Sequence, residues 1–563
     1  MQHSISDHNR RLQFLCQDTV GSARAGSTLL VVLVVVVMLS LGAYTFSELM
    51  IVELEATNVY GRSVQSRELA LSGIELAAAF VGDRSEVDGW NSYHNPEQFQ
   101  NINLLPGEVT RTNGYFSVVA PVTTDSQTSA VRFGLVNESG KLNLNILASE
   151  EEEEEGDAVD RLMYIPNMTE DIAAAILDWI DDDDETRSYG AESDYYETLE
   201  SSYFAKNGPL ESLDELMLVR DITPEMLYGE DTNRNGILDP NENDGDATLP
   251  FDNADGILNP GWFDYLTVHS REINIRPDGS EKINLNMTML TELYDLLEVE
   301  LGPDEARFIV AYRTSGPVET LADLESGGSL TTVGGGMSEE QALNEIANGL
   351  AKALFSENGI TVTRAGIDLS GGGVYTINSL FDLVGSEVET EIDGQKTTLQ
   401  SPWLADSAAM TTDLPILHDL LTTTKNQFIE GRIHIDEARL ETLLGVPYMD
   451  EDLARAIVNS QMTGTNGSSS TEISQARQTT GWLVIEGLTT IEQMRQLAPY
   501  LCSGGDVFRA QSLGYFGQAG PVIRVEAIID GTFIPPRITS IRDLSNLGSG
   551  YSLPTLQGTN QDD

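Results

Sequence analysis

Residues 24–49 read RAGSTLLVVLVVVVMLSLGAYTFSEL and contain the longest apolar run in the sequence. The 20 residues from Ser27 to Phe46 carry no charge. A helix of that length rises 1.5 Å per residue and spans roughly 30 Å, the thickness of one bilayer core. The small residues Ala25 and Gly26 precede the run, whereas a secretory signal is cut after a shorter run. We therefore expect a membrane anchor.

A basic leader precedes this run and should stay in the cytoplasm, so that the bulk of the chain is exported. A leader that ends in glycine before a retained apolar helix resembles the prepilin class, and the resemblance implies cleavage by prepilin peptidase between Gly26 and Ser27. Most members of that class have Glu as the fifth mature residue, where this chain has Val31. That departure is typical of one minor pseudopilin, type II secretion protein K. An ordinary signal anchor is the alternative.

The composition limits the classes of function. With 563 residues the chain exceeds what one hydrophobic core organises, so we expect a membrane-proximal part and two or more globular units. A formal net charge of -57 repels phosphate backbones, which argues against nucleic acid and favours cations such as calcium as partners. A cut after Gly26 removes Cys16 and leaves Cys502, so no internal disulfide can form.

Segments near the two ends of the chain predict one sheet. The helical pattern of the anchor continues to about residue 80 with apolar residues on one face. Residues 115–122 and 130–147 are typical of strands rich in Val and Phe, and residues 506–531 and 537–543 have the same character. We therefore predict an α+β fold in which a pilin-like N-terminal transmembrane helix and a small antiparallel sheet are interrupted by a large, mostly α-helical insertion.

The insertion contains a recurring pattern. Its copies are KLNLNIL (141–147), KINLNMTML (282–290) and RIHIDEARL (432–440). Each combines a basic residue, a short strand and entry into a helix, and is followed by a helix with acidic residues in the first turn, where the helix dipole favours them. The elements that close the units lie at 208–219, 316–324 and 487–497, with a stray copy at 376–384. We predict about three related units, similar to SAM or helix-hairpin-helix domains.

A family resemblance becomes specific in DWIDDDDETRSYGAESDYYETLESSYFAKNGPLESLDEL, residues 178–216. A DWxD with an acidic cluster, GAE with paired Tyr, a Tyr before KNGP and an SLxEL cap are similar, in order and spacing, to the signature of type II secretion protein K. Residues 325–430 cannot be mapped onto that family. Within the acidic cluster, Asp181 to Glu185 are interpreted as a solvated loop, with metal ligation as the alternative.

The resemblance implies a minor pseudopilin that caps or initiates the pseudopilus tip of a type II secretion system, for protein export across the outer membrane. It implies assembly with minor pseudopilins I and J and with the major pseudopilin, calcium binding, no enzymatic activity, and a single-pass position in the inner membrane with the soluble bulk in the periplasm. The predicted domains are a leader (1–26), the N-terminal helix (27–80, with 27–46 in the membrane), the first part of the sheet (81–140), the inserted helical domain (141–497, with the calcium-loop region 229–262), the second part of the sheet (498–547) and a disordered tail (548–563).

DTNRNGILDPNE, residues 231–242, fits the twelve-residue EF-hand loop position by position. Seven oxygens around a hard cation suit calcium better than magnesium, and Gly236 makes the sharp turn. Pro224 precedes the loop and Gly245 follows it, so no long helices flank it. An isolated calcium staple is therefore favoured over a sensor, with an ion-free acidic turn as the alternative. The predicted ligands are Asp231, Asn233, Asn235, the carbonyl of Ile237, Asp239 and Glu242.

FDNADGILNPGW, residues 251–262, repeats the core of that loop in degenerate form. Phe251 and Trp262 stand at the first and last ligand positions, where neither can coordinate a cation. The candidate ligands of this second loop are Asp252, Asn253, Asp255 and Asn259.

The sequence offers little support for catalysis or for DNA binding. Its six His form no HExxH motif or close pair, and no P-loop or GxSxG is present. Residues 443–458 are also typical of a helix-hairpin-helix module, but Gly445 lacks its partner glycine and acidic residues surround it. A signal-anchored extracytoplasmic scaffold or adhesion protein that binds calcium is the remaining alternative.

Overall fold

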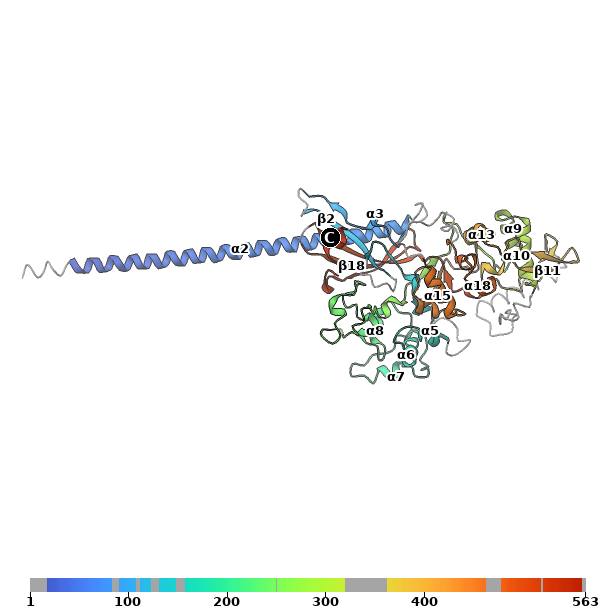
Figure 1. The fold of residues 1–563 in the computed structure, drawn as a ribbon, viewed down its shortest axis with the longest axis horizontal. Helices are drawn as coiled ribbons and strands as arrows, with labels where there is room; N and C mark the ends of the chain where they lie inside the picture. The colour runs from blue at the N-terminus through green and yellow to red at the C-terminus, as the bar shows by residue number, and fades with distance from the viewer. Residues whose placement is uncertain are drawn as a thin grey trace, which may run out of the picture.

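The computed structural model has a long helix that projects from a broad mixed head (Figure 1). The structure describes residues 18–83, 91–107, 112–122, 131–147, 157–249, 251–318, 362–461, 477–517 and 520–558. The projecting helix is α2 (Asp18–Gly82), which includes the predicted span of 27–80. Among the described residues it is the one helix that is long and apolar enough to cross a membrane. Its length and composition fit a single-pass membrane anchor.

The helix α2 changes character where it reaches the head. Its side chains are exposed through the apolar run, and burial begins at Ser66. Beyond that point, buried side chains recur with helical spacing at Leu69, Ala70, Ile74, Ala77, Ala78 and Val81. The helix also lies close to the sheet at Gly73, where an added Cβ would stand 2.9 Å from Cδ2 of Phe116. The second half of the helix is thus seated directly on the sheet.

Strands from both ends of the chain form one antiparallel sheet. In spatial order they are β1 (Ile102–Leu105), β2 (Gly114–Pro121), β17 (Val507–Phe516), β18 (Ile523–Asp530) and β19 (Arg537–Asp543), while β3 (Val131–Arg132) pairs with β2 and β4 (Val136–Asn137) pairs with β17. Ser117 of β2 and Tyr515 of β17, 398 positions apart, share a hydrogen bond of 2.9 Å. Phe116 lies under α2, and the alternation of a strand places Val118 on the same buried face. The predicted antiparallel sheet is therefore completed by the C-terminal part of the chain.

Three units of one plan follow each other between β4 and β17. Each opens with a two-residue strand that pairs in parallel with a two-residue strand at its end. The pairs are β5 (Leu142–Asn143) with β6 (Leu266–Thr267), β8 (Ile283–Asn284) with β13 (Leu421–Thr422), and β15 (Ile433–His434) with β16 (Leu501–Cys502). One continuous apolar core runs through all three units. The insertion therefore extends to Cys502, a few residues past its predicted end at 497.

Helices and short hairpins fill the units. The first contains α4 (Leu144–Leu147), α5 (Asp157–Leu162), α6 (Glu170–Ile180), α7 (Ser193–Tyr196), η3 (Leu213–Leu218), α8 (Pro224–Tyr228), η4 (Pro240–Glu242) and η5 (Trp262–Asp264); the second contains α9 (Leu290–Glu300), α10 (Pro303–Ser315), η6 (Leu380–Asp382) and α13 (Ser407–Leu420); the third contains α14 (Leu440–Leu444), α15 (Glu451–Ser460), α17 (Trp482–Ile485) and α18 (Ile491–Leu497). Two short hairpins are β9 (Thr363–Arg364) with β10 (Ile367–Asp368) and β11 (Glu387–Ile392) with β12 (Gln395–Gln400), while β7 (Arg271–Ile273) pairs in antiparallel fashion with the distant β14 (Phe428–Glu430). Acidic residues occupy the first turns of α6, α10 and α15, where they favour helix formation.

The first two units hold their closing elements by the same hydrogen bonds. Oδ1 of Asn145 accepts from the N–H of Leu210 (2.8 Å), and its Nδ2 donates to the carbonyl of Leu210 (3.0 Å). Asn286 makes the same pair with the N–H (3.0 Å) and carbonyl (2.9 Å) of Ile377. The segment around Ile377, interpreted from the sequence as a stray copy, therefore closes the second unit. Most of 316–324, the expected closing element, lies outside the described residues.

The end of the chain is folded, so the prediction of a disordered tail over 548–563 is wrong for most of that segment. It contains the helix α19 (Leu553–Gln557), and Tyr551 and Leu556 are buried in the core of the sheet. The physical reason is that a few apolar side chains in a Gly- and Ser-rich segment are enough to hold it when the sheet offers an uncovered face. Residues 559–563 lie outside the described residues.

Candidate metal centre

The predicted calcium loop, residues 231–242, lies between the first unit and the strands of the sheet. Asp231 is 8% exposed, and its carboxylate accepts hydrogen bonds from the backbone N–H groups of Asn235 (3.0 Å) and Gly236 (2.8 Å). Gly236 has a φ of 67°, and an added Cβ would overlap Pro121. Both the backbone conformation and the lack of space require glycine at this turn.

The side chains of three predicted ligands meet inside the loop. Oδ2 of Asp239 accepts from the side-chain amides of Asn233 (2.6 Å) and Asn235 (3.1 Å). Oδ1 of Asn233 is buried and has no hydrogen-bond partner among the described residues. The N–H of Ile237, whose carbonyl is a predicted ligand, donates to Oδ1 of Asn235 (2.7 Å). The loop therefore brings together carboxylate and amide groups, whose oxygens are of the type that a hard cation such as calcium takes, although Nδ2 of each Asn faces Asp239 here.

Glu242, the predicted bidentate ligand, is held by the loop itself. Its Oε1 accepts from the N–H and the hydroxyl of Thr232, both at 3.2 Å, and its Oε2 accepts from the N–H of Asp239 at 3.1 Å. With Asp239 it forms a capping box at the start of η4. A cation would therefore compete with backbone donors for both oxygens of this carboxylate.

The carboxyl groups of the loop are forced together in a poorly solvated place. Burial raises the pKa of Asp231 to about 6. Burial, followed by repulsion from Asp231 and Asp239, raises the pKa of Glu242 to about 7, although the hydrogen bond from the Asp239 backbone opposes this rise. A bound cation would reverse both shifts because it favours the charged form of each group. The donor set therefore fits calcium in chemical type and in electrostatics.

The loop is also tied to the sheet and to the C-terminal segment. The hydroxyl of Tyr551 donates to the carbonyl of Asn235 (2.8 Å), and Nδ2 of Asn235 donates to the carbonyl of Gly550 (2.7 Å). Nε2 of Gln511 in β17 donates to the carbonyl of Arg234 (3.2 Å). Through these contacts, an ion in the loop would stiffen the joint between the insertion and the sheet.

In the second, degenerate loop the predicted ligands satisfy other partners. The carboxylate of Asp252 accepts from the N–H groups of Gly245 and Asp244, both at 2.9 Å. Nδ2 of Asn253 donates to Asp255 (2.9 Å), and both residues are exposed. Asn259 is tied instead to Glu230, whose side chain accepts from its N–H (3.1 Å). These contacts build turns that are stable without an ion.

A buried ion cluster joins the first unit to the sheet nearby. Glu138 of η2 (Glu138–Gly140) is fully buried, and its Oε1 lies 3.0 Å from Nε of Arg509 and 3.4 Å from Nζ of Lys141. The hydroxyl of Thr267 donates to its Oε2 (2.5 Å). Burial alone would raise the pKa of Glu138, but the attraction of Arg509 and Lys141 outweighs it and lowers the pKa to about 2. Glu138 is therefore ionised whenever the head is folded near neutral pH.

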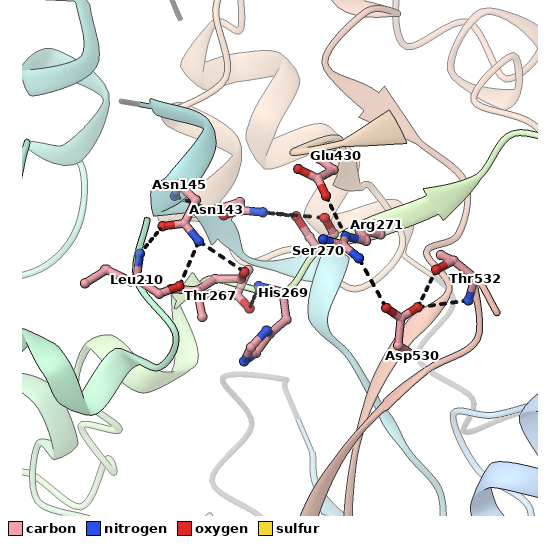
Figure 2. Close-up of polar contacts among 11 residues, drawn as sticks. Asn143, Asn145, Leu210, Thr267, His269, Ser270, Arg271, Glu430, Asp530 and Thr532 are labelled. Carbon is pink, nitrogen blue, oxygen red and sulfur yellow. Dashed lines mark hydrogen bonds and ion pairs between the residues drawn. The ribbon is translucent and has the colours of Figure 1, made fainter. Parts of the chain in front are cut away.

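A second polar junction, drawn in Figure 2, links β5 of the first unit, β14, and β18 of the sheet. Nδ2 of Asn143 in β5 donates to the hydroxyl of Ser270 (3.0 Å). The next residue, Arg271, bridges Glu430 (2.5 Å) and Asp530 of β18 (3.4 Å). Sequence reasoning missed Arg271, whose one signal is that it is a basic residue at the start of a short alternating strand, β7.

The predicted processing residues are part of the projecting helix. Gly26 and Ser27 lie within α2, eight or more residues after its start at Asp18. The side chains of the apolar run that follows them are exposed along its whole length, and Val31 is 59% exposed. Such a surface is suited to lipid or to other apolar helices.

One family model matches the chain. It describes protein K of the type II secretion system (T2SS) and covers residues 140–228, which extend from η2 to α8. A chain in the solved structure of the GspK-GspI-GspJ complex from the enterotoxigenic Escherichia coli Type 2 Secretion System is similar to this one. The two chains have 10% sequence identity, and the similarity covers 88% of this chain and 98% of that chain. The TM-score of 0.31 is too low to carry an argument about the fold. No curated protein matches the chain.

The family match and the architecture point to the same class of protein. The matched residues contain the DWxD and GAE signature, and they sit inside a head whose sheet is packed against a long apolar helix, as in a pilin. A membrane helix of this kind, an interrupted antiparallel sheet and a protein K domain occur here in one chain. Residues 140–228 of this chain therefore match protein K of the type II secretion system.

Proposed function

We propose that the chain is a minor pseudopilin of the type II secretion system, of the protein K type, and that it stands at the tip of the pseudopilus, where it caps or initiates the filament. The observation that carries this proposal is the breadth of the head, in which three helical units extend beyond the sheet (Figure 1). Subunits within a filament bring their apolar helices side by side, so bulk of this size between neighbours would separate them. A subunit at the end of a filament has no neighbour on one side, so the bulk of the three helical units can be accommodated there.

We further propose that the anchor is retained in the inner membrane after prepilin peptidase has removed the leader, with the head in the periplasm. N-terminal sequencing of protein extracted from membranes should give Ser27 as the first residue, because the small residues Ala25 and Gly26 precede the apolar run. An uncut N-terminus at Met1 would contradict this and would favour the signal-anchored scaffold or adhesion protein. Recovery of a soluble chain that lacks residues 27–46 would contradict both.

The proposed partners are the I- and J-type minor pseudopilins and the major pseudopilin, held through the exposed face of α2. Val37→Asp should remove the protein from the membrane fraction and from co-purified pseudopilins, because a carboxylate at membrane depth costs about 2.5–3.5 kcal/mol without a partner. Val59→Asp in the same helix is the matched control, since the two side chains are 57% and 59% exposed and Val59 lies beyond the apolar run. Equal retention of the two variants would contradict the assignment.

We propose that the 231–242 loop binds one calcium ion as a structural staple. Calcium should raise the Tm of the full chain in detergent and a chelator should lower it, since a ligand at 100 times its Kd adds about 2.7 kcal/mol to the free energy of unfolding. Asp231→Asn should reduce this calcium-induced rise, whereas the exposed Asp194→Asn should not. Differential scanning calorimetry measures the shifts. An Asp231→Asn chain that gains as much from calcium as the wild type would contradict the site.

Catalysis is not part of the proposed function. Burial raises the pKa of the Cys502 thiol, so it is a poor nucleophile, and burial lowers the pKa of His418 to about 3, which keeps that imidazole neutral. Cys502 is buried in β16, and His418 lines a small cavity beside Lys282 and Arg432, two cations that further disfavour its protonation. The proposed role is that of a structural component.

Binding to nucleic acid is not proposed either. The pair α14 and α15 is the part closest to a helix-hairpin-helix or SAM-like motif, and this kinship is offered as a proposal about fold only. Asp450 caps α15 by accepting from the N–H of Leu453 (2.8 Å), and Glu451 and Asp452 are exposed in its first turn. These carboxylates occupy the place where a DNA-binding hairpin presents N–H groups to phosphate. Retention of DNA on a filter at low salt by the full chain would contradict this reading.

A further inference from the structure

A cavity of about 220 Å³ lies between the first unit and the face of the sheet that points away from α2. Arg509 of β17 lines it, and strand alternation puts this side chain on the face opposite to Ser512, whose hydroxyl lies close to Gly73 of α2. Phe263 of η5 lines the cavity from the first unit. Ile257, which is 56% exposed, stands at its mouth. A ligand can therefore reach the cavity from solvent.

Basic residues gather around this cavity in a chain that is otherwise acidic. Four cations and three carboxylates line it, whereas the whole chain has 32 basic and 89 acidic residues. The balance of charge in the lining is thus the reverse of that in the chain. The cations are Lys141, Arg234, Arg439 and Arg509, and the carboxylates are Asp231, Asp264 and Glu526.

Three of these cations surround the ring of Phe263. The guanidinium of Arg509 lies 4.0 Å from the ring centroid, that of Arg234 lies 5.4 Å from it, and Nζ of Lys141 lies 5.6 Å from it. Arg234 also stacks on Tyr228, at 4.0 Å from the centroid of that ring. An aromatic face attracts a cation through its quadrupole but does not neutralise it. The positive charge at this wall therefore remains available to a ligand.

The carboxylates that contact these three cations are shared with other cations. Glu138 serves two of them at once, because its Oε1 lies 3.0 Å from Arg509 and 3.4 Å from Lys141. Asp214 lies 3.8 Å from Arg234 and is at the same time paired with an arginine of β19, Arg542. On each side of the Phe263 wall, one carboxylate therefore balances two cations.

The three carboxylates in the lining have cations of their own. Asp264 pairs with Arg439. Asp231 and Glu526 both attract Arg524, a fully buried guanidinium. Together with the two shared carboxylates and the cations that they serve, these groups comprise six cations and five carboxylates. One positive charge is in excess, which is the charge that a single carboxylate balances.

We propose that this cavity binds one carboxylate that is carried on an apolar or aromatic body. Arg234 is available to it, because 3.8 Å from Asp214 is too far for a hydrogen bond and a guanidinium can hold a carboxylate by two parallel N–H donors. Val119, Val136 and Leu258 supply apolar walls. An apolar cavity of roughly 150 Å³ holds benzene, so this larger one has room for a ring and a short acidic arm.

Isothermal titration calorimetry of the full chain in non-ionic detergent tests this with two probes, 3-phenylpropionate and its neutral amide. The acid should bind about tenfold more tightly than the amide, because hydrogen bonds between charged groups are the strong ones. Arg234→Gln should remove this preference, whereas Arg455→Gln, at an exposed arginine in α15, should keep it. Calcium is present throughout, so that the loop at 231–242 stays in one state. Equal affinity for acid and amide, or no binding of the acid, would overturn the proposal.

Two substitutions at the exposed mouth test the charge preference without disturbing the core. Ile257→Lys should tighten the binding of 3-phenylpropionate and Ile257→Asp should weaken it, each by about threefold at low salt, since the added charge acts through water. Both variants lose the same apolar side chain, so the difference between them reports charge alone. Equal affinity of the two variants for the acid would overturn the proposal.

A substitution that fills the cavity tests the location of the site. Val136 is half-buried in β4 and lines the cavity, so Val136→Phe should abolish binding of the acid and leave every charged group in place. The Tm of this variant shows whether it is folded, and the two variants of Ile257 decide the question if it is not. A folded Val136→Phe chain that binds the acid as tightly as the wild type would overturn the proposal.

A short peptide that ends in phenylalanine distinguishes the two sources of such a carboxylate. If the peptide binds more tightly than 3-phenylpropionate and its C-terminal amide does not bind, the ligand is the end of a polypeptide. If the peptide is excluded while 3-phenylpropionate binds, the ligand is a small free acid. Both results support the carboxylate site. A peptide amide that binds as tightly as the peptide acid would overturn it.

Discussion

Replacing Glu138 by Gln is expected to lower the free energy of unfolding of the head by about 3 kcal/mol, because it leaves two buried cations without their anion. Arg509 and Lys141 both face this carboxylate, at 3.0 and 3.4 Å. The value is at the lower end of the range for broken buried pairs, since Asp264 also attracts both cations. Chemical denaturation of the full chain in detergent, followed by tryptophan fluorescence, measures the change.

The control for this substitution is Glu451→Gln in α15. Glu451 pairs with Arg455 at 2.6 Å, but both side chains are more than half exposed. Surface pairs of this kind contribute about 0–1 kcal/mol. If the two variants lose the same stability, the cluster around Glu138 contributes no more than a surface pair and the prediction fails.

The same cluster gives the head a defined response to acid. The pKa of Glu138 is lowered to about 2 from the ordinary value of 4.5, so its contribution is fully present above pH 4.5 and is lost as the pH falls toward 2. The gap in stability between the wild type and Glu138→Gln should therefore narrow over that interval. Other carboxyl groups titrate there too, but they are common to both proteins and cancel in the difference. A gap that stays constant would show that Glu138 has an ordinary pKa.

Gly73→Val is expected to separate α2 from the sheet. An added Cβ at this position stands 2.9 Å from Cδ2 of Phe116 and closer still to the hydroxyl of Ser512, and both of these side chains are buried. Overpacking of this kind costs about 1–3 kcal/mol, and the larger value applies where the neighbours cannot move. Limited proteolysis should cut the variant near the end of α2 at protease concentrations that spare the wild type.

Gly61→Val provides the matched control in the same helix. Nothing lies within 4 Å of an added Cβ at Gly61, so the substitution changes helix propensity in the same way but meets no neighbour. The control should resist protease like the wild type. Equal sensitivity of the two variants would mean that helix propensity, and not the contact with the sheet, decides the outcome.

The features that were predictable from the sequence are those with a local period. The uncharged run predicts the anchor. The pattern of a basic residue followed by a short alternating strand recurs because each copy must form a two-residue strand and then hold a closing element. The closing element of the second unit was misplaced because 316–324 and the segment around Ile377 are equally good local matches. Only the hydrogen bonds of Asn286 distinguish them.

The features that escaped prediction depend on residues far apart in the sequence. Tyr551 and Leu556 look like isolated apolar residues in a polar tail, and their burial follows from a sheet face that other parts of the chain create. Glu138 and Arg509 carry no pattern that links them across the insertion. The burial of Asp181 is hidden for the opposite reason, because the row of acidic residues from Asp181 to Glu185 is typical of a solvated loop.

The pairing of β2 with β17 has a consequence for how the protein is made. The helix α2 emerges first, but the strand that forms the middle of its docking surface is among the last segments to leave the ribosome. The nascent chain must therefore present an uncovered apolar helix face while several hundred residues of insertion mature as an independent folding unit. Because long-range strand pairing is slow, the face of α2 from Leu69 to Val81 stays without its partner strand until synthesis is complete.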